Sequence, residues 1–218
     1  MTTTSTPDRT PALGPTGTFV EARIKPLQYG YLQDHPDAVR TLAQLRRGAG
    51  RLAHEVPELW GVAFDDGLYT RGLSGEEETG YAENAAHAAL TLYATHQQSR
   101  RDTRMHLPGR GLGGAVRRLM PPGDIDEPLR RRFVQAGSAT TMSTRLYRLR
   151  EIVTLLRRES VPLDYALLAD QLHRAQRPGG MAKVRAEWGR GFHAHRTRTA
   201  PGTEPAPTTD TTTDKDDQ

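Results

Sequence analysis

The sequence of 218 residues contains no cysteine. Disulfide frameworks, thiolate metal sites and thiol nucleophiles are therefore excluded, and the fold must depend on the burial of apolar side chains. Long apolar runs are also missing: no window approaches the roughly 20 consecutive apolar residues of a membrane span, and the first residues lack the apolar stretch of a signal peptide. We expect a cytoplasmic protein that makes no membrane contact.

Lysine is scarce, and nearly all basic residues are arginine. From Arg100 to Arg198 there are 21 Lys and Arg against 9 Asp and Glu, a net charge of +12, whereas the rest of the chain holds 9 against 17, a net charge of −8. Arginine makes planar, bidentate contacts to phosphate and stacks on bases. Such residues also suit ordinary solvated faces in a protein from a GC-rich genome, but their segregation favours a polyanionic partner.

The chain length allows one helical bundle or two smaller lobes. Residues 1–15 and 197–218 are rich in Thr, Pro and Asp and bury too little apolar surface to order, so we expect both to be disordered. Residues 16–196 then form one all-helical domain.

The apolar periodicity of this domain is helical almost throughout. We predict an all-α fold, a compact bundle of about eight helices with short loops. Pro26 must kink or shorten the first helix. Ser74 and Glu77 form a capping-box pair at the start of an Ala-rich helix that runs to about Gln98. The stretch from Pro57 to Gly67 fits either a helical turn or a buried strand.

The clearest amphipathic segment begins after Thr141. Its apolar residues follow heptad spacing and form one stripe: Met142, Leu146, Leu149, Val153 and Leu156. On a helical wheel Arg145 and Arg148 flank this stripe on one side, and Arg150 and Arg157 flank it on the other. Asp164 is placed to cap the next helix, and Trp188 belongs to the core face of the last one.

The sequence offers little catalytic chemistry. His193 and His195 are two residues apart and cannot share a metal, and His87 and His96 miss the i, i+4 spacing of two ligands on one helix face. We interpret these histidines as solvated or core residues. Capping and surface charge explain the carboxylates Asp65, Asp66 and Glu76 to Glu78. We expect no metal, no cofactor and no enzymatic activity.

The run Gly109-Arg-Gly-Leu-Gly-Gly114 lacks the preceding strand and the lysine of a P-loop. Its amides, before a helix start, could still contact a backbone phosphate. Trp60, in a loop-like stretch, could be a stacking platform for a base, although a buried anchor is the favoured interpretation.

The arginines cluster along successive helices, where they could align into one groove that binds backbone without reading sequence. From this charge argument we predict nucleic-acid contacts at six residues. They are Arg110, Arg130, Arg131, Arg145, Arg148 and Arg150.

The segment from Thr144 to Ala194 resembles the C-terminal signature of the CasB family, the small subunit of type I-E CRISPR Cascade complexes. The matching residues are Leu155-Leu156-Arg157, Pro162-Leu163-Asp164-Tyr165, Asp170 with Leu172, and Val184-Arg185 through Trp188-Gly189 to Phe192. Leu45-Arg46-Arg47-Gly48 and the stretch from Leu92 to Leu119 resemble the family too, so the resemblance covers roughly residues 20 to 195. Ala175 and His193 depart from it at positions where aromatics are common.

The resemblance implies a non-catalytic, all-helical subunit, present in two head-to-tail copies beside the other Cascade subunits. It implies that the subunit helps to hold crRNA and target DNA and stabilises the displaced non-target strand. By motif position it assigns nucleic-acid contacts to Arg46, Arg47, Arg117 and Arg118.

Two other functions stay open. The helices around Pro178-Gly179-Gly180 loosely imitate a helix-turn-helix, which would suit a free-standing DNA-binding transcriptional regulator that binds duplex as a symmetric dimer. A hydrolase with an unrecognised site would show turnover by the purified protein.

Overall fold

The computed structural model describes residues 12–70, 72–73 and 75–199, with only the backbone of residues 195–199. Within this part the chain forms α-helices and short 3₁₀ turns, and its only β-type pairing is a single bridge between His106 and Leu163. The all-α prediction is confirmed. The disorder predicted for the chain ends falls mostly on residues 1–11 and 200–218, which lie outside the described residues.

Eight of the described helices have seven residues or more, as the periodicity predicts. They are α1 (Pro15–Leu32), α2 (Pro36–Leu45), α5 (Glu76–Gln97), α6 (Leu112–Arg118), α7 (Glu127–Ser138), α8 (Met142–Arg158), α9 (Tyr165–Gln176) and α10 (Gly180–Thr199). The short elements are η1 (Arg46–Gly48), η2 (Ala53–Glu55), η3 (Pro57–Leu59), α3 (Trp60–Ala63) and α4 (Asp66–Tyr69). The stretch from Pro57 to Gly67 is thus helical and not a strand.

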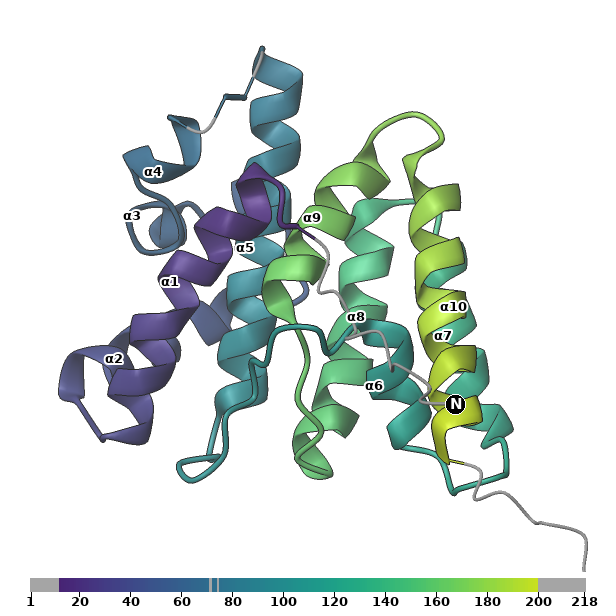
Figure 1. Cartoon of the computed structure of the whole chain (residues 1–218). Coiled ribbons are helices and arrows are strands. Elements are labelled where there is room, and N and C mark those ends of the chain that lie inside the picture. Colours follow the sequence, from purple (N-terminus) through teal and green to yellow (C-terminus); the bar gives the residue numbers. More distant parts are fainter. Residues whose placement is uncertain (1–11, 71, 74, 200–218) are drawn as a thin grey trace, which may run out of the picture.

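Helices α5 and α9 lie between the two sides of the molecule (Figure 1). On one side α1 and α2 pack with α5; on the other, α10 packs on α6 and α9, and α7 packs on α8. The alanines of α5 explain its position, because small side chains let α1, α8 and α9 approach its axis closely. One continuous apolar core joins both sides, so the described residues form a single bundle.

Polar side chains fix several helix starts, including the predicted cap of α9 by Asp164. Asp164 accepts a hydrogen bond from the Leu167 amide at 2.9 Å, and Thr141 and Asp126 cap α8 and α7 in the same way. The start of α5 differs, because its N-cap is Gly75 at a φ of 91°. Ser74, predicted as the cap, lies outside the described residues. Helix α1 continues through Pro26, which lies on its exposed side, so this proline does not shorten the helix.

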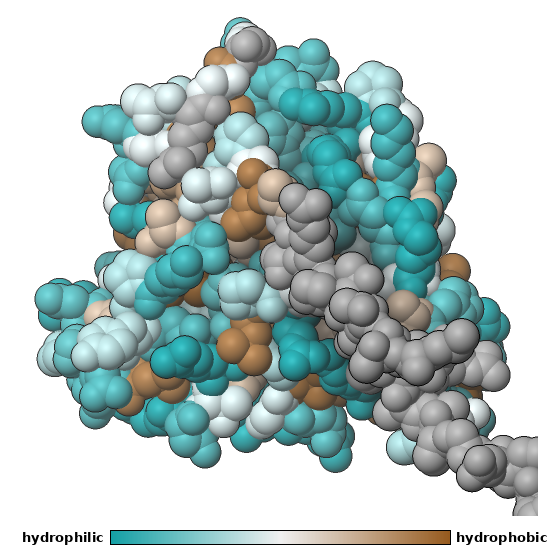
Figure 2. Space-filling view, in the orientation of Figure 1, coloured by the Kyte–Doolittle hydropathy of each residue, from teal (hydrophilic) through white to brown (hydrophobic). Residues whose placement is uncertain are grey.

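The apolar stripe of α8 faces the core as predicted. Leu146, Leu149, Val153 and Leu156 are fully buried, and Met142 packs at the edge of the same core. Figure 2 shows mainly polar residues on the viewed face, with apolar ones in small separate groups. None of the described helices combines the length and the hydropathy that a membrane crossing requires.

Candidate nucleic-acid interface

The turn after η1 lies against α8. Gly50, at a φ of 86°, lies so close to α8 that a Cβ there would be 3.2 Å from Arg150 Cδ and 3.9 Å from Tyr147 Cα. Arg46 and Arg47 belong to η1, which ends two residues before this glycine. The fold therefore places the turn that follows Arg46 and Arg47 beside the helix that carries Arg148 and Arg150, although the two segments are far apart in the sequence. We call Arg46, Arg47, Tyr147, Arg148 and Arg150 the Tyr147 surface.

The helical period explains why α8 presents these side chains outward. With Leu146, Leu149 and Val153 turned to the core, Tyr147 and Arg150 fall on the opposite face. Tyr147 is 56% exposed, and the Arg148 guanidinium carbon lies 5.5 Å from the centroid of its ring. Arg148 also pairs with Glu151 at 3.1 Å. An exposed aromatic ring among guanidinium groups has the composition of a stacking platform for nucleic-acid bases.

Arg110 lies on a second part of the molecule, in the loop before α6. The loop is held from α9: the Gly109 amide donates to Asp164 Oδ2, and the Asp164 amide donates to the Arg110 carbonyl, both at 2.8 Å. The Arg110 side chain is exposed and lines a cavity of about 1130 Å³, together with Arg118 of α6. Arg118 is half-buried.

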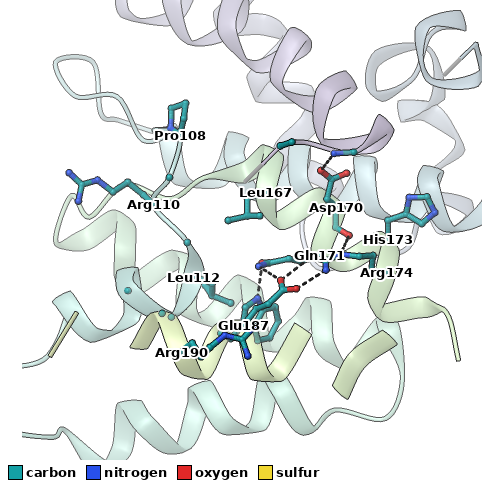
Figure 3. Close-up of a pocket in the computed structure, with 18 of the residues that line it drawn as sticks. Pro108, Arg110, Leu112, Leu167, Asp170, Gln171, His173, Arg174, Glu187 and Arg190 are labelled. Carbon is teal, nitrogen blue, oxygen red and sulfur yellow. Dashed lines mark hydrogen bonds and ion pairs between the residues drawn. The ribbon is translucent and has the colours of Figure 1, made fainter. Parts of the chain in front are cut away.

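This cavity lies between the start of α1, the loop before α6, and helices α9 and α10 (Figure 3). Arg174 forms a bidentate ion pair with Glu187, at 2.6 and 2.8 Å, and Gln171 bridges Glu187 and Trp188. These contacts fasten α9 to α10 and neutralise charge inside the cavity.

A second group of charges joins α9 to the start of α5. Glu78 accepts hydrogen bonds from Arg177 and is paired with His173, which bonds Thr16 of α1 at 2.7 Å. The bonds from Arg177 hold the pKa of Glu78 at about 2, well below its usual range. The charged residues here hold three helices together.

Two predicted contact residues are buried inside the fold. Arg117 and Arg145 are each 4% exposed. Arg117 Nη1 donates to the Pro121 carbonyl at 3.0 Å, and Arg145 Nη2 donates to the Ala139 carbonyl at the end of α7. Burial lowers the pKa of Arg145, and nearby Arg185 adds to the effect. The prediction put Arg145 at the edge of the apolar stripe, but α7 covers that edge, so in this conformation neither guanidinium reaches the surface.

Arg130 and Arg131 lie on the outer side of α7. Arg130 pairs with Glu127 one turn earlier, at 2.8 Å, while Arg131 is exposed. Helix α7 packs on α8, which carries the Tyr147 surface, and buries Leu129 and Phe133 in the core. Within the described residues, no hydrogen bond, ion pair or ring contact joins the α7 arginines to the Tyr147 surface.

The histidines of α5 belong to the core, one of the two interpretations given above. His87 and His96 are fully buried, and burial lowers their pKa values to about 4 and about 3. His96 Nδ1 is 2.8 Å from the hydroxyl of Tyr165, another fully buried residue. Among the described residues, no group of three or more His, Asp or Glu side chains is arranged to hold a metal ion.

The sequence did not lead us to Tyr147 as a contact residue, and it led to the wrong environment for Trp60. Tyr147 stands next to Leu146 of the stripe, and its position on the outer face was the signal that could have identified it. Trp60 is 52% exposed, so the interpretation as a buried anchor is wrong. Its indole N–H donates to the Ala53 carbonyl at 3.0 Å, which fixes the ring without covering it.

Comparison with known families gives one strong match. The model of the family described as CRISPR-associated protein Cse2 matches residues 41–193. A search of curated proteins found no match.

Solved structures give matches over most of the chain. CasB from Thermobifida fusca is 57% identical, with a TM-score of 0.78, over 84% of this chain and 99% of that one. CasB from Thermus thermophilus, at 21% identity and a TM-score of 0.58, covers 84% and 99% of the two chains. A chain of a CRISPR RNA-guided surveillance complex, at 21% identity and a TM-score of 0.62, covers 84% and 96%. The two matches at 21% show a shared fold alone.

Proposed function

Because the chain belongs to the CRISPR-associated protein Cse2 family, we propose that it is a non-catalytic, nucleic-acid-binding subunit of a crRNA-guided surveillance complex, type I-E Cascade. In this role it lies beside the other subunits and a second copy of itself, braces crRNA and target DNA, and stabilises the displaced strand of the R-loop. The observation that supports a site is the close approach of Gly50, in the turn that follows Arg46 and Arg47, to Tyr147 and Arg150 of α8.

The energetics of an R-loop explain why such a surface is useful. The RNA–DNA duplex that forms is about as stable as the DNA duplex that it replaces, so contacts to the freed strand can shift the balance. Arginines bind its phosphates whatever the sequence, and releasing counterions makes this binding fall steeply with salt. Arg47 and Arg150 are exposed and suited to this task.

Tyr147 adds a contact that only an unpaired strand can use. In a duplex the faces of the bases are already stacked, whereas a freed base can lie on an aromatic ring at any sequence. The guanidinium of Arg148, 5.5 Å from the centroid of the ring, adds a second planar group beside it. The Tyr147 surface therefore favours single strands over duplex.

The proposal is tested first on the isolated full-length chain. Binding to a fluorescent oligo(dT) strand is measured by anisotropy between 50 and 200 mM salt, conditions that resolve counterion release. The double variant Arg47→Glu/Arg150→Glu should bind at least about tenfold more weakly and with a smaller salt slope. Lys25→Glu/Arg40→Glu, two exposed charge reversals on α1 and α2 that change the net charge by the same amount, is the matched control. Equal losses in both variants would show that net charge, and not this surface, determines binding.

The same variants are then placed in the reconstituted complex. Weaker R-loop formation by the double variant, with unchanged assembly, is the expected result. Unchanged target affinity across salt concentrations would remove the proposed role.

A free-standing DNA-binding regulator is the alternative. The exposed side of α10 carries Lys183, Arg185 and Arg190, which could meet a duplex. Preference for a specific palindromic duplex over oligo(dT), together with purification from the host without crRNA, would favour it.

A further inference from the structure

A second exposed aromatic site has the opposite electrical character. Trp60 and Tyr69 are 52% and 44% exposed and line one cavity of about 350 Å³ at the α3–α4 side of the bundle. Asp65, Asp66 and Glu83 line the same cavity. Large exposed aromatic side chains in one depression are typical of binding sites.

Hydrogen bonds hold this cavity in shape. Trp60 Nε1 donates to the Ala53 carbonyl, and Tyr69 Oη donates to Glu83 Oε1, both at 3.0 Å. Asp65 caps α4 through the Gly67 amide and pairs with Arg23 at 3.0 Å. The geometry of the cavity is therefore formed before any partner binds, which lowers the entropic cost of binding.

The charges of the cavity select the class of partner. Asp66 and Glu83 have no cation among the ion pairs of the described residues, and Arg23 balances only Asp65. Burial and the neighbouring Glu83 raise the pKa of Tyr69 to about 12, as expected in a negative environment. A nucleic-acid backbone would be repelled here, whereas a cation would be attracted by the carboxylates and by the faces of the aromatic rings.

We propose that the cavity of Trp60, Tyr69, Asp66 and Glu83 binds an arginine side chain of a neighbouring protein subunit. A guanidinium group stacks flat on an indole ring while its edge donates to carboxylates, a combination that lysine cannot reproduce as well. Tryptophan, tyrosine and arginine are also the residues that dominate protein interfaces energetically. The molecule then has a basic surface around Tyr147 for nucleic acid and an acidic aromatic cavity for protein. This inference rests on the proposed membership of a multi-subunit complex, but not on the nucleic-acid role.

The first test uses the isolated chain and a blocked tripeptide, acetyl-Gly-Arg-Gly-amide. The chain has two tryptophans, Trp60 and the buried Trp188, so its NMR spectrum contains one indole N–H signal from each. The Arg peptide should shift the Trp60 signal saturably and leave that of Trp188 in place. The matched peptide with neutral citrulline should bind at least about fivefold more weakly, since it keeps the shape but loses the charge.

Two carboxylates that line the cavity provide the variants. Asp66→Asn and Glu83→Gln should each weaken binding of the Arg peptide about two- to tenfold, while Asp102→Asn, an exposed residue elsewhere, should not. Equal binding of the Arg and citrulline peptides, or no saturable shift of the Trp60 signal, would overturn the proposal.

A second test uses the assembled complex. A photo-crosslinking phenylalanine derivative replaces Glu58, an exposed residue two positions before Trp60, and the crosslinked partner is identified by mass spectrometry. A crosslink to an arginine-bearing segment of another subunit supports the proposal. A crosslink to nucleic acid, or none in a complex that contains all its subunits, contradicts it.

Discussion

The carboxylate of Asp170 on α9 accepts a hydrogen bond from the backbone amide of Gly17 on α1, at 2.7 Å. Its other oxygen accepts from the Gly14 amide, also at 2.7 Å. Helix α1 has no cap from its own N-cap residue, Gly14, so a side chain from a distant helix satisfies its first amides. A Cβ at Gly17 would lie 2.2 Å from Asp170 Oδ2, which explains the glycine.

Loss of this cap should destabilise the whole bundle. We expect Asp170→Ala to lower the free energy of unfolding by about 1–3 kcal/mol, because two part-buried amides lose a charged acceptor. Urea unfolding followed by circular dichroism measures the change. Asp102→Ala, an exposed carboxylate, should stay within about 0.5 kcal/mol of wild type. Equal stability of Asp170→Ala and wild type would mean that water replaces the cap at little cost.

Adjacent glycines of α6 should respond in opposite ways to the same substitution. A Cβ at Gly113 would lie 1.9 Å from the Trp188 carbonyl oxygen on α10, whereas one at Gly114 would lie 3.6 Å from the nearest atom. We expect Gly113→Ala to destabilise by more than about 2 kcal/mol through forced separation of α6 and α10. Gly114→Ala should be neutral or stabilise by up to about 1 kcal/mol, because alanine favours the helix. Thermal unfolding of both variants and of wild type measures these changes in stability and tests the close approach of α6 to α10 at Gly113.

These glycines show where sequence reasoning succeeds and where it stops. Periodicity predicted the helices and the core stripe of α8, because both depend on residues a few positions apart. The role of Gly113 depends on an α10 backbone far along the chain, which no local pattern encodes. The capping role of Asp170 also depends on a distant part of the chain, the start of α1. The sequence analysis therefore named Asp170 only as a residue that matches the family.

The arginine predictions show the same difference between what local patterns predict and what contacts between distant segments decide. The helical wheel separated the faces of α8 correctly, yet it could not show that the end of α7 covers Arg145. Nor could it show that Gly50 brings η1 to Arg150. Tertiary packing decides which arginines of a basic segment remain available to a partner.

Stability should fall as the pH is lowered from 6.5 toward 4. The pKa of His87 in the folded protein is about 4, because the side chain is buried, whereas in the unfolded chain it is near 6.5. Within this window the unfolded chain binds the additional proton, so protonation favours unfolding; above pH 6.5 the stabilisation is fully present. His96, with a pKa of about 3, acts in the same direction. Urea unfolding at several pH values measures the slope.

A variant separates His87 from other titrating groups. His87→Leu puts an apolar side chain in place of the buried imidazole and removes the proton-binding site, so the stability of this variant should depend less on pH between 6.5 and 4. An unchanged slope would assign the acid sensitivity to other residues.

Arg145 should contribute to stability and not to nucleic-acid binding by the folded chain. Arg145→Met retains much of the side-chain volume but removes the donor to the Ala139 carbonyl. We expect a loss of about 1–3 kcal/mol in the free energy of unfolding. The affinity of folded protein for oligo(dT) should stay within about twofold of wild type, since the side chain is 4% exposed. A large loss of affinity with unchanged stability would show that this arginine reaches the strand after all.

Tyr147 should act through its ring and not through charge. The Tyr147→Ala variant should lose about 1–3 kcal/mol of affinity for oligo(dT), the usual contribution of one base stacked on an aromatic side chain. Tyr147→Phe should bind like wild type, because it keeps the ring. Neither variant changes the charge, so the salt slope should match that of wild type, unlike the slope of Arg47→Glu/Arg150→Glu.

The matched control for this prediction is Tyr29 on α1, which is 64% exposed and lies outside the Tyr147 surface. Tyr29→Ala should leave the affinity unchanged. If Tyr147→Phe bound as weakly as Tyr147→Ala, the hydroxyl and not the ring would be the contact, and if Tyr29→Ala bound equally weakly, no local platform would exist. A loss confined to Tyr147→Ala, with an unaltered salt slope, requires a base on that ring, because removing a phosphate contact would have changed the slope.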